Sequence, residues 1–297
     1  MDLRRLALLV PPIRRLHEDR ARLCEECARL TAKLQEERTR LTSKLQEERA
    51  GLTAQLQEER ARLTTQLREE RTRHAAAQPM ARLLQQMEAC GIDLVLDVGA
   101  NKGQFAQSLR SLGFRGEIVS FEPLSIAFAV LQRHCDEDDA WSCINAALGD
   151  ADGEAEINIS ANSYSSSLLP VRDWTVVAEP GIAYVAQEPV SVRRLDGLLG
   201  ELPRAKRIFL KVDTQGFDRP VIEGATGILD RIVLVQTELA WTPAYEGQAE
   251  LGEMLALMSG LGFEPVHIMP GWVDKTGFLR EVDIVFAREG EQSLPGK

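Results

Sequence analysis

The chain has 297 residues, of which 44% are hydrophobic and 5% aromatic, and its formal net charge is −10. This length leaves ample chain for a packed core, and the composition excludes a disordered, collagenous or disulfide-rich protein. The acidic balance argues against a nucleic-acid partner, because phosphates favour basic surfaces. Residues 1–78 carry a slight excess of basic side chains, and the acidic excess lies in residues 79–297. We therefore expect two differently built parts.

Residues 1–15 are expected to form a short segment of their own. Their apolar run has a basic flank and ends at Pro11 and Pro12. The run is too short for a transmembrane helix and lacks a cleavage site typical of signal peptides. A membrane contact through this run stays open as an alternative. We expect a cytoplasmic protein.

The five cysteines are an odd number, which favours a reducing compartment. Cys24 and Cys27 form a CxxC pair, but neither a second pair nor two nearby histidines complete a zinc set. The sequence leaves the role of this pair open.

Residues 30–73 consist of four tandem units of eleven residues, each beginning with Leu-Thr and containing Glu-Glu-Arg. The leucines recur at spacings of four and seven, which keeps them on one face of an α-helix. Eleven residues in three turns favour a straight or slightly right-handed bundle. We therefore expect residues 16–78 to form a long helical coiled coil that makes the protein a homo-oligomer. A solitary charged helix, or a helix bound to a membrane surface or to another protein, remains an alternative.

Residues 80–290 alternate short β-rich runs with helical stretches, which predicts an α/β fold with a doubly wound parallel sheet. The last two runs predict an antiparallel hairpin at one end, and residues 291–297 a tail. The expected strands are 94–99, 117–123, 141–148, 154–160, 207–213, 231–238, 264–269 and 281–287; the expected helices are 80–90, 103–112, 124–135, 218–229 and 248–261.

The first motif runs from Asp97 to Gly103, between a predicted strand and a predicted helix. An open α/β sheet binds nucleotide-like ligands at this position. Gly99 allows a tight turn, and Gly103 allows close packing. The GxGxxG fingerprint of dinucleotide sites is absent. The spacing Asp97, Gly99, Asn101, Gly103 instead suits the loop of S-adenosylmethionine enzymes. Glu122 ends the next strand, where its carboxylate can accept hydrogen bonds from both ribose hydroxyls.

The later strand ends carry further polar residues. Asn145 and Ala146 close the third strand, beside the expected adenine position, and a hydroxyl-rich loop follows at residues 162–168. Asp213 and Glu238 end the fourth and fifth strands and therefore share the carboxyl edge of the sheet. A carboxylate there can act as general base on an acceptor hydroxyl or hold a divalent ion.

No histidine or asparagine clearly completes a metal set with these carboxylates, so we expect no metal site. We assign Asp213 as the base. His134 and His267 are the alternatives.

The ordered motifs DVGANKGQFA, SFEP, NAALGD, SSSL, LKVDTQGFDRPVIEGA and VQTELAWTPAYEG resemble the FkbM family of S-adenosylmethionine-dependent methyltransferases over residues 80–288. The resemblance implies a class I, Rossmann-like methyltransferase fold that uses S-adenosyl-L-methionine. It also implies O-methylation, commonly of a hydroxyl on a sugar, a glycan or a related natural product.

The resemblance also implies roles for single residues. Gly99, Asn101 and Gly103 would line the cofactor loop, and Glu122 would hold the ribose. Asn145 and Ala146 would flank the adenine. On the acceptor side, the residues that would face the site of methyl transfer are Asp213, Gln215 and Glu238. The eleven-residue repeat lies outside the resemblance.

Two other functional classes remain as alternatives. The repeat could assemble partner proteins, with the α/β domain a non-catalytic, cofactor-binding part of a scaffold. A nicotinamide-dependent reductase is disfavoured, because the chain lacks both GxGxxG and a Tyr-x-x-x-Lys pair.

Overall fold

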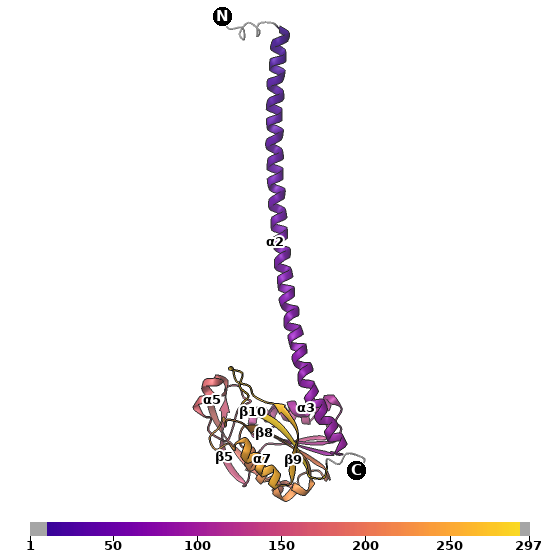
Figure 1. Cartoon of the computed structure of the whole chain (residues 1–297), viewed down its shortest axis with the longest axis vertical. Helices are drawn as coiled ribbons and strands as arrows, with labels where there is room; N and C mark the ends of the chain where they lie inside the picture. The colour runs from indigo at the N-terminus through magenta and orange to yellow at the C-terminus, as the bar shows by residue number, and fades with distance from the viewer. Residues whose placement is uncertain (1–10, 292–297) are drawn as a thin grey trace. The chain divides into compact units, whose positions relative to one another are not determined.

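The computed structural model describes residues 11–291, with side chains at residues 14–66 and 79–291. Most of the segment expected at residues 1–15 and of the tail expected at 291–297 lies outside the described residues. The chain divides into two compact units, residues 1–74 and 75–297, which we describe separately (Figure 1). None of the described helices has the length and apolar character needed to cross a bilayer.

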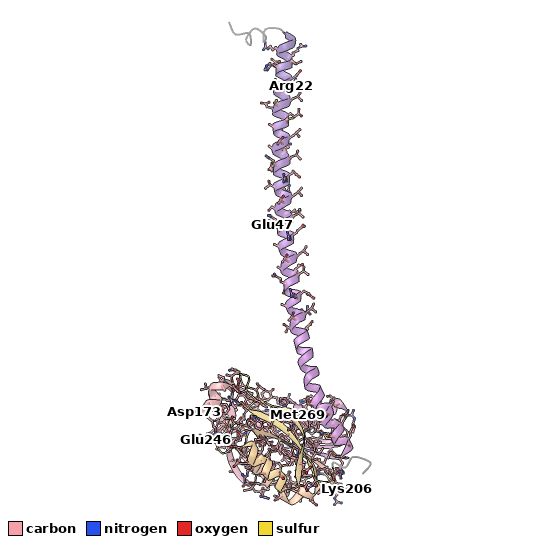
Figure 2. All side chains as sticks on the ribbon, viewed as in Figure 1. Arg22, Glu47, Asp173, Lys206, Glu246 and Met269 are labelled. Carbon is pink, nitrogen blue, oxygen red and sulfur yellow. The ribbon has the colours of Figure 1, made fainter. Side chains whose placement is uncertain are left out.

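Helix α2, Pro11–Ala89, contains the whole repeat and confirms the predicted long helix. Its leucines from Leu16 to Leu63 are exposed to solvent, for example Leu34 at 70%. Figure 2 shows the described side chains along this helix projecting to both sides of the ribbon. The structure holds a single chain, so the coiled coil stays a prediction.

Helix α2 does not end at Pro79, where the sequence suggested a boundary. Proline inside a helix costs about 3 kcal/mol, because it removes a hydrogen bond and crowds the preceding turn. The turns after it bury Leu83, Leu84 and Met87 in the core of residues 75–297. Burying side chains of this size offsets that cost.

A seven-stranded sheet forms the centre of residues 75–297, in the order β3-β2-β1-β7-β8-β10-β9. Five strands are parallel, and β10 runs antiparallel to β8 and β9. This confirms the predicted α/β sheet with an antiparallel hairpin at one end. Its strands are β1 (Leu94–Val98), β2 (Glu117–Phe121), β3 (Trp141–Ile144), β7 (Ile208–Val212), β8 (Ile232–Ala240), β9 (Phe263–Pro270) and β10 (Glu281–Arg288).

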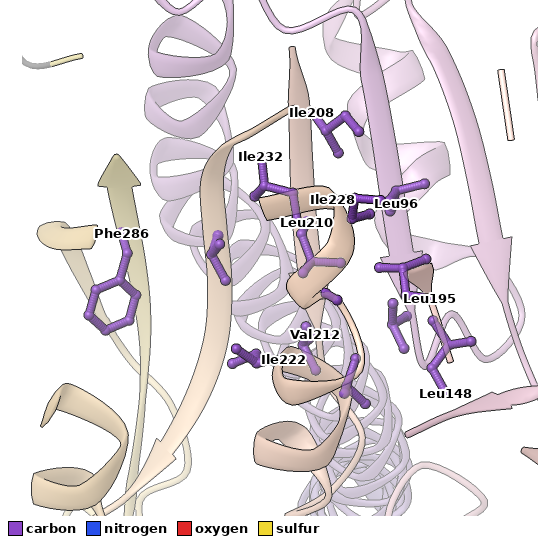
Figure 3. Close-up of a cluster of buried hydrophobic side chains, with 14 of the residues drawn as sticks. Leu96, Leu148, Leu195, Ile208, Leu210, Val212, Ile222, Ile228, Ile232 and Phe286 are labelled. Carbon is purple, nitrogen blue, oxygen red and sulfur yellow. The ribbon is translucent and has the colours of Figure 1, made fainter. Parts of the chain in front are cut away.

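Successive side chains of each strand point to opposite faces of the sheet. Because both faces carry apolar side chains, helices cover both of them. Leu94 and Leu96 of β1 join one core cluster, and Val95 joins the other. The first cluster includes α6 (Asp218–Glu223), α7 (Leu251–Gly260) and the 3₁₀ turns η2 (Asp196–Leu198) and η3 (Thr226–Arg231). Figure 3 shows Leu96, Leu210 and Val212 within it. The second cluster includes the end of α2, α3 (Gln104–Leu112) and α4 (Ser125–Cys135).

A smaller three-stranded sheet, in the order β4-β6-β5, was only partly predicted. Its strands are β4 (Ala147–Leu148), β5 (Gly153–Ser160) and β6 (Tyr184–Arg193), and α5 (Asp173–Ala178) and η1 (Pro180–Ile182) lie between the last two in sequence. The strand expected at residues 141–148 is split into β3 and β4, with the chain leaving the large sheet between them. This change of sheet places Asn145 and Ala146 at the break.

Candidate functional site

The loop after β1 brings the backbone of two strand ends into close contact. Gly99 has a positive φ of 74°, and a Cβ atom there would lie 1.9 Å from the carbonyl oxygen of Asp213. Gly103 has a φ of 87°, and its Cβ would lie 2.8 Å from the ring of Trp141. Only glycine fits both constraints, since other residues rarely adopt this backbone region. Asn101 also has a positive φ, of 49°.

Glu122 directly follows β2 and holds this loop in place. Its Oε2 accepts a hydrogen bond of 2.8 Å from the backbone N–H of Asn101, and its Oε1 accepts one of the same length from Leu124. Burial of the side chain raises the pKa of Glu122 to about 7, although the two backbone N–H groups act in the opposite direction. An ionised carboxylate has about four lone-pair sites, so both oxygens can accept a further hydrogen bond.

Asn145 supports the site from outside. Its exposed side chain donates to the backbone oxygens of Glu122 (2.8 Å) and Pro123 (3.0 Å), which fixes the strand end that carries Glu122. Ala146 lines the cavity described below. The two neighbours therefore have different positions: one faces solvent and the other the cavity.

Lys211 on β7 is a buried cation that sequence analysis missed. Its Nζ lies 3.2 Å from Asp97 Oδ1 and 3.3 Å from Asp213 Oδ2, and so joins the ends of β1 and β7. Burial alone would lower the pKa of Lys211, but Asp213 and Asp97 raise it above its ordinary value. The ammonium therefore stays charged. Phe105 of α3 lies beside it, with 5.5 Å between Nζ and the ring centroid.

Gln215 connects the two carboxylates expected at the acceptor side. Its Nε2 donates to Asp213 Oδ1 and to Glu238 Oε2, each at 3.1 Å. Its Oε1 accepts a hydrogen bond of 2.9 Å from the hydroxyl of Tyr245. The backbone of Gln215 has a φ of 54°, a conformation that non-glycine residues seldom adopt. Its carbonyl accepts a bond of 2.7 Å from Ser167, in the hydroxyl-rich loop.

A row of carboxylates crosses the sheet at this level. Glu238 on β8 pairs directly with Asp283 on β10, and Asp213 follows the end of β7, which is the other neighbour of β8. Burial, and next the charge of Asp213, raises the pKa of Asp283 to about 6 and that of Glu281 to about 7. The pKa of Glu238 is also raised, by the same causes. Protonated forms of these carboxyls are therefore accessible near neutral pH.

These residues surround one cavity of about 430 Å³, a size typical of small-molecule sites. The predicted site residues that line it are Gly99, Asn101, Glu122, Ala146, Asp213, Gln215 and Glu238. It is also lined by Tyr164 of the hydroxyl-rich loop and by the unpredicted Lys211, Gln236, Asp283 and Phe105. Asp97, Gly103 and Asn145 do not line the cavity but contact or adjoin the residues that do. Their roles remain predictions.

The unpredicted residues carried little signal in the sequence. Lys211 precedes Asp213 by two positions and therefore shares its face, which an alternation argument would have found. Asp283 reaches the site only through the pairing of β10 with β8, which places it beside Glu238. Neither alternative base is part of the site: His134 stacks on Trp141, His267 lies on β9, and neither lines the cavity. Within the described part of the chain, no three His, Cys, Asp or Glu side chains are grouped so as to hold a metal ion.

Comparisons with known proteins find several methyltransferases to which this chain is similar. Methyltransferase 1 of Beauveria bassiana is 26% identical over 197 residues, which cover 60% of this chain and 75% of that protein. The 2-O-methyltransferase NoeI of Sinorhizobium fredii is 24% identical over 202 residues, covering 64% and 80%. The crystal structure of methyltransferase FkbM from Methylobacillus flagellatus KT is 12% identical with a TM-score of 0.39, over 65% of this chain and 43% of that chain.

The model of the methyltransferase FkbM domain matches residues 97–265, more than half of the chain. The matched region begins at Asp97, includes both sides of the cavity as far as Glu238, and ends in β9. The chain therefore belongs to the methyltransferase FkbM domain family.

Proposed function

We propose that this protein is an S-adenosylmethionine-dependent O-methyltransferase. Its acceptor is a hydroxyl of a sugar, a glycan or a related natural product, and residues 16–78 assemble it into a homo-oligomer. The observation that carries the proposal is a single cavity shared by two sets of residues. Glu122 and the Gly99 loop form the side expected for the cofactor, and Asp213 and Glu238 the side expected for the acceptor. The name of the relative NoeI, a 2-O-methyltransferase, supports a hydroxyl acceptor.

The cavity suits S-adenosylmethionine in both shape and chemistry. The positive φ of Gly99 and its close approach to the carbonyl of Asp213 turn the loop so that its backbone lines the cavity. Glu122 keeps free lone pairs that can accept hydrogen bonds from the two ribose hydroxyls. Leu124, Ala147 and Ile157 supply apolar wall for an adenine ring. When bound, the cofactor would supply a methyl group already activated on a sulfonium.

The remaining work for the protein is to align the acceptor oxygen and to take up its proton. We assign Asp213 as the group that takes up the proton of the acceptor hydroxyl. Its carboxylate lines the cavity and is held by Lys211 and Gln215. Gln236 also lines the cavity, and its buried Oε1 has no hydrogen-bond partner among the described residues. A second hydroxyl of a sugar acceptor would satisfy this oxygen.

The first test is calorimetric titration of S-adenosylmethionine and of its demethylated product into the full chain. We expect binding that the variant Glu122→Ala weakens at least tenfold, because the variant loses the ribose acceptor and frees the N–H groups of Asn101 and Leu124. Glu117→Ala is the matched control, since Glu117 lies exposed at the other end of β2.

Titration alone does not identify the acceptor. A panel of methyl glycosides of hexoses and deoxyhexoses, assayed for release of the demethylated cofactor, tests the proposed reaction. Release that depends on one glycoside supports O-methylation of a sugar. No binding by the wild-type chain would instead favour the scaffold.

A further inference from the structure

The leucine face of α2 extends beyond the four repeats. Leu16, Leu23 and Cys27 precede Leu30 at spacings of seven, four and three, which are the spacings of neighbours on one helix face. All described members of this face are exposed to solvent. We call the set the leucine face; it consists of Leu16, Leu23, Cys27, Leu30, Leu34, Leu41, Leu45, Leu52, Leu56 and Leu63.

The residues that directly border the leucine face on its two sides carry opposite charges, and Lys33 and Lys44 lie farther out on the acidic side. With about 100° per residue, Glu37 lies about 40° to one side of the midline between Leu30 and Leu34, and Arg38 about 60° to the other side. The next two repeats place the equivalent residues, eleven and twenty-two positions later, at the same angles to their own leucines: Glu48 and Glu59 on the acidic flank, Arg49 and Arg60 on the basic flank. Among residues 14–66, no ion pair involves any of these six side chains.

The basic flank contains no acid that could neutralise it. Its next residues outward are Thr31, Thr42 and Thr53, and each threonine hydroxyl donates to a backbone carbonyl of its own helix at 2.8 Å. Carboxylates that pair with these arginines would therefore come from another helix. A partner helix that supplies them must carry a row of acids with the same eleven-residue period.

A second copy of α2 supplies such a row in one orientation only. In a parallel pair of helices, the left flank of one helix faces the right flank of the other, so glutamates face arginines. In an antiparallel pair, like flanks face each other, and the arginine rows meet with no acid between them. Like charges at such positions repel, and opposite charges attract.

We propose that α2 pairs with α2 of a second copy of this chain, parallel and in register. The inference rests on the proposed self-association of residues 16–78 and adds its direction. The leucine faces meet at the centre, and each Glu37 flank contacts the Arg38 flank of the partner. The stems of the arginines cover the gaps between successive leucine pairs. Both Cys27 side chains then lie at the same level of the interface, whereas Cys24 lies off the leucine face.

The first experiment uses disulfide formation in the full chain. Cys24→Ser retains Cys27, and the matched variant Cys27→Ser retains Cys24; the three other cysteines are common to both. After mild oxidation, non-reducing electrophoresis should show at least fivefold more crosslinked dimer for Cys24→Ser. In an antiparallel pair, the two Cys27 residues would lie tens of ångströms apart, at about 1.5 Å per residue. If the protein has the mass of a dimer but the two variants crosslink equally, or neither crosslinks, the parallel arrangement is overturned.

The second experiment tests the charges directly. A swapped chain carries Arg in place of Glu37, Glu48 and Glu59, and Glu in place of Arg38, Arg49 and Arg60, so its net charge is unchanged. When tagged wild-type and swapped chains are refolded together, parallel pairing predicts that each type pairs with itself. Mixed pairs in excess of a random distribution overturn the proposal, because an antiparallel arrangement favours them.

The mass of the wild-type protein, measured by light scattering, tests self-association separately from the direction of pairing. A monomeric mass overturns both the self-association and its direction. An oligomer that fails the crosslinking and mixing tests overturns the direction alone.

Discussion

Both carboxylate oxygens of Asp213 are held by neighbouring side chains at the carboxyl edge of the sheet. An ammonium contacts one of its oxygens and an amide the other, since Lys211 lies 3.3 Å from Oδ2 and Gln215 3.1 Å from Oδ1. These contacts fix the direction of the carboxylate relative to the cavity. Asp97, on the far side of Lys211, contributes by holding the ammonium. The motif Lys211-Val-Asp213-Thr-Gln215 thus forms one positioned unit.

The variant Asp213→Asn should retain cofactor binding and lose methyl transfer. The amide keeps an oxygen that can accept from Gln215, but it cannot take up the hydroxyl proton. General base catalysis contributes about 10²–10⁴-fold, and we expect a loss of turnover in that range. Initial rates with a methyl glycoside that the wild type accepts measure it. The control is Asp230→Asn, at an exposed position outside the cavity. Unchanged turnover with unchanged cofactor affinity would remove Asp213 from its assigned role.

The elements of the large sheet could be predicted from the sequence because each has a local signature. β1, β7 and β8 each begin with a run of three or four apolar residues and carry polar residues toward the end of the strand. β6 was missed because Gln187, Glu188 and Pro189 interrupt its apolar pattern, and its burial alternates only near its end. Asp283 was missed because its neighbourhood depends on strand pairing, which a single strand does not encode.

The carboxylate row on β7, β8 and β10 makes stability depend on pH. Burial raises the pKa of Asp283 to about 6 and that of Glu281 to about 7, and it raises the pKa of Glu238 as well. The folded protein therefore binds these protons more tightly than the unfolded chain does. Their contribution to stability is complete below the unfolded pKa values near 4 and is lost as the pH rises through 6 to 7.

The chain without ligands should therefore melt at a higher temperature at pH 6 than at pH 8. A change of about 1 kcal/mol corresponds to roughly 2–4 °C for a domain of this size, and we expect a difference of that order. Calorimetric melting of the wild type and of Asp283→Asn measures it, and the variant should show a smaller difference. Glu154→Gln, at an exposed position on β5, is the control. A wild-type melting temperature that rises from pH 6 to pH 8 would contradict the assignment.

At the scale of the whole molecule, the two units have different sources of stability. Residues 75–297 enclose their own core, to which the last turns of α2 contribute Leu83, Leu84 and Met87. The described leucines of the repeat contribute to no core within one chain. A single helix leaves that apolar face in water, and most helix stability in proteins comes from packing of such a face. The sequence also indicates two parts, because the eleven-residue period ends before Pro79; the bounds 16–78 and 80–290 stay a prediction.

A chain that begins at residue 75 should therefore be monomeric and folded, while the full chain is oligomeric. It retains Leu83, Leu84 and Met87, so its melting temperature should stay within a few degrees of the full chain. It also retains Glu122 and the rest of the cavity, so its affinity for S-adenosylmethionine should be unchanged. Light scattering gives the mass, and calorimetry gives the other two quantities. An equal number of subunits in both chains would show that residues 16–78 are not the assembly device; a monomer with weakened cofactor binding would show that the helix also supports the catalytic unit.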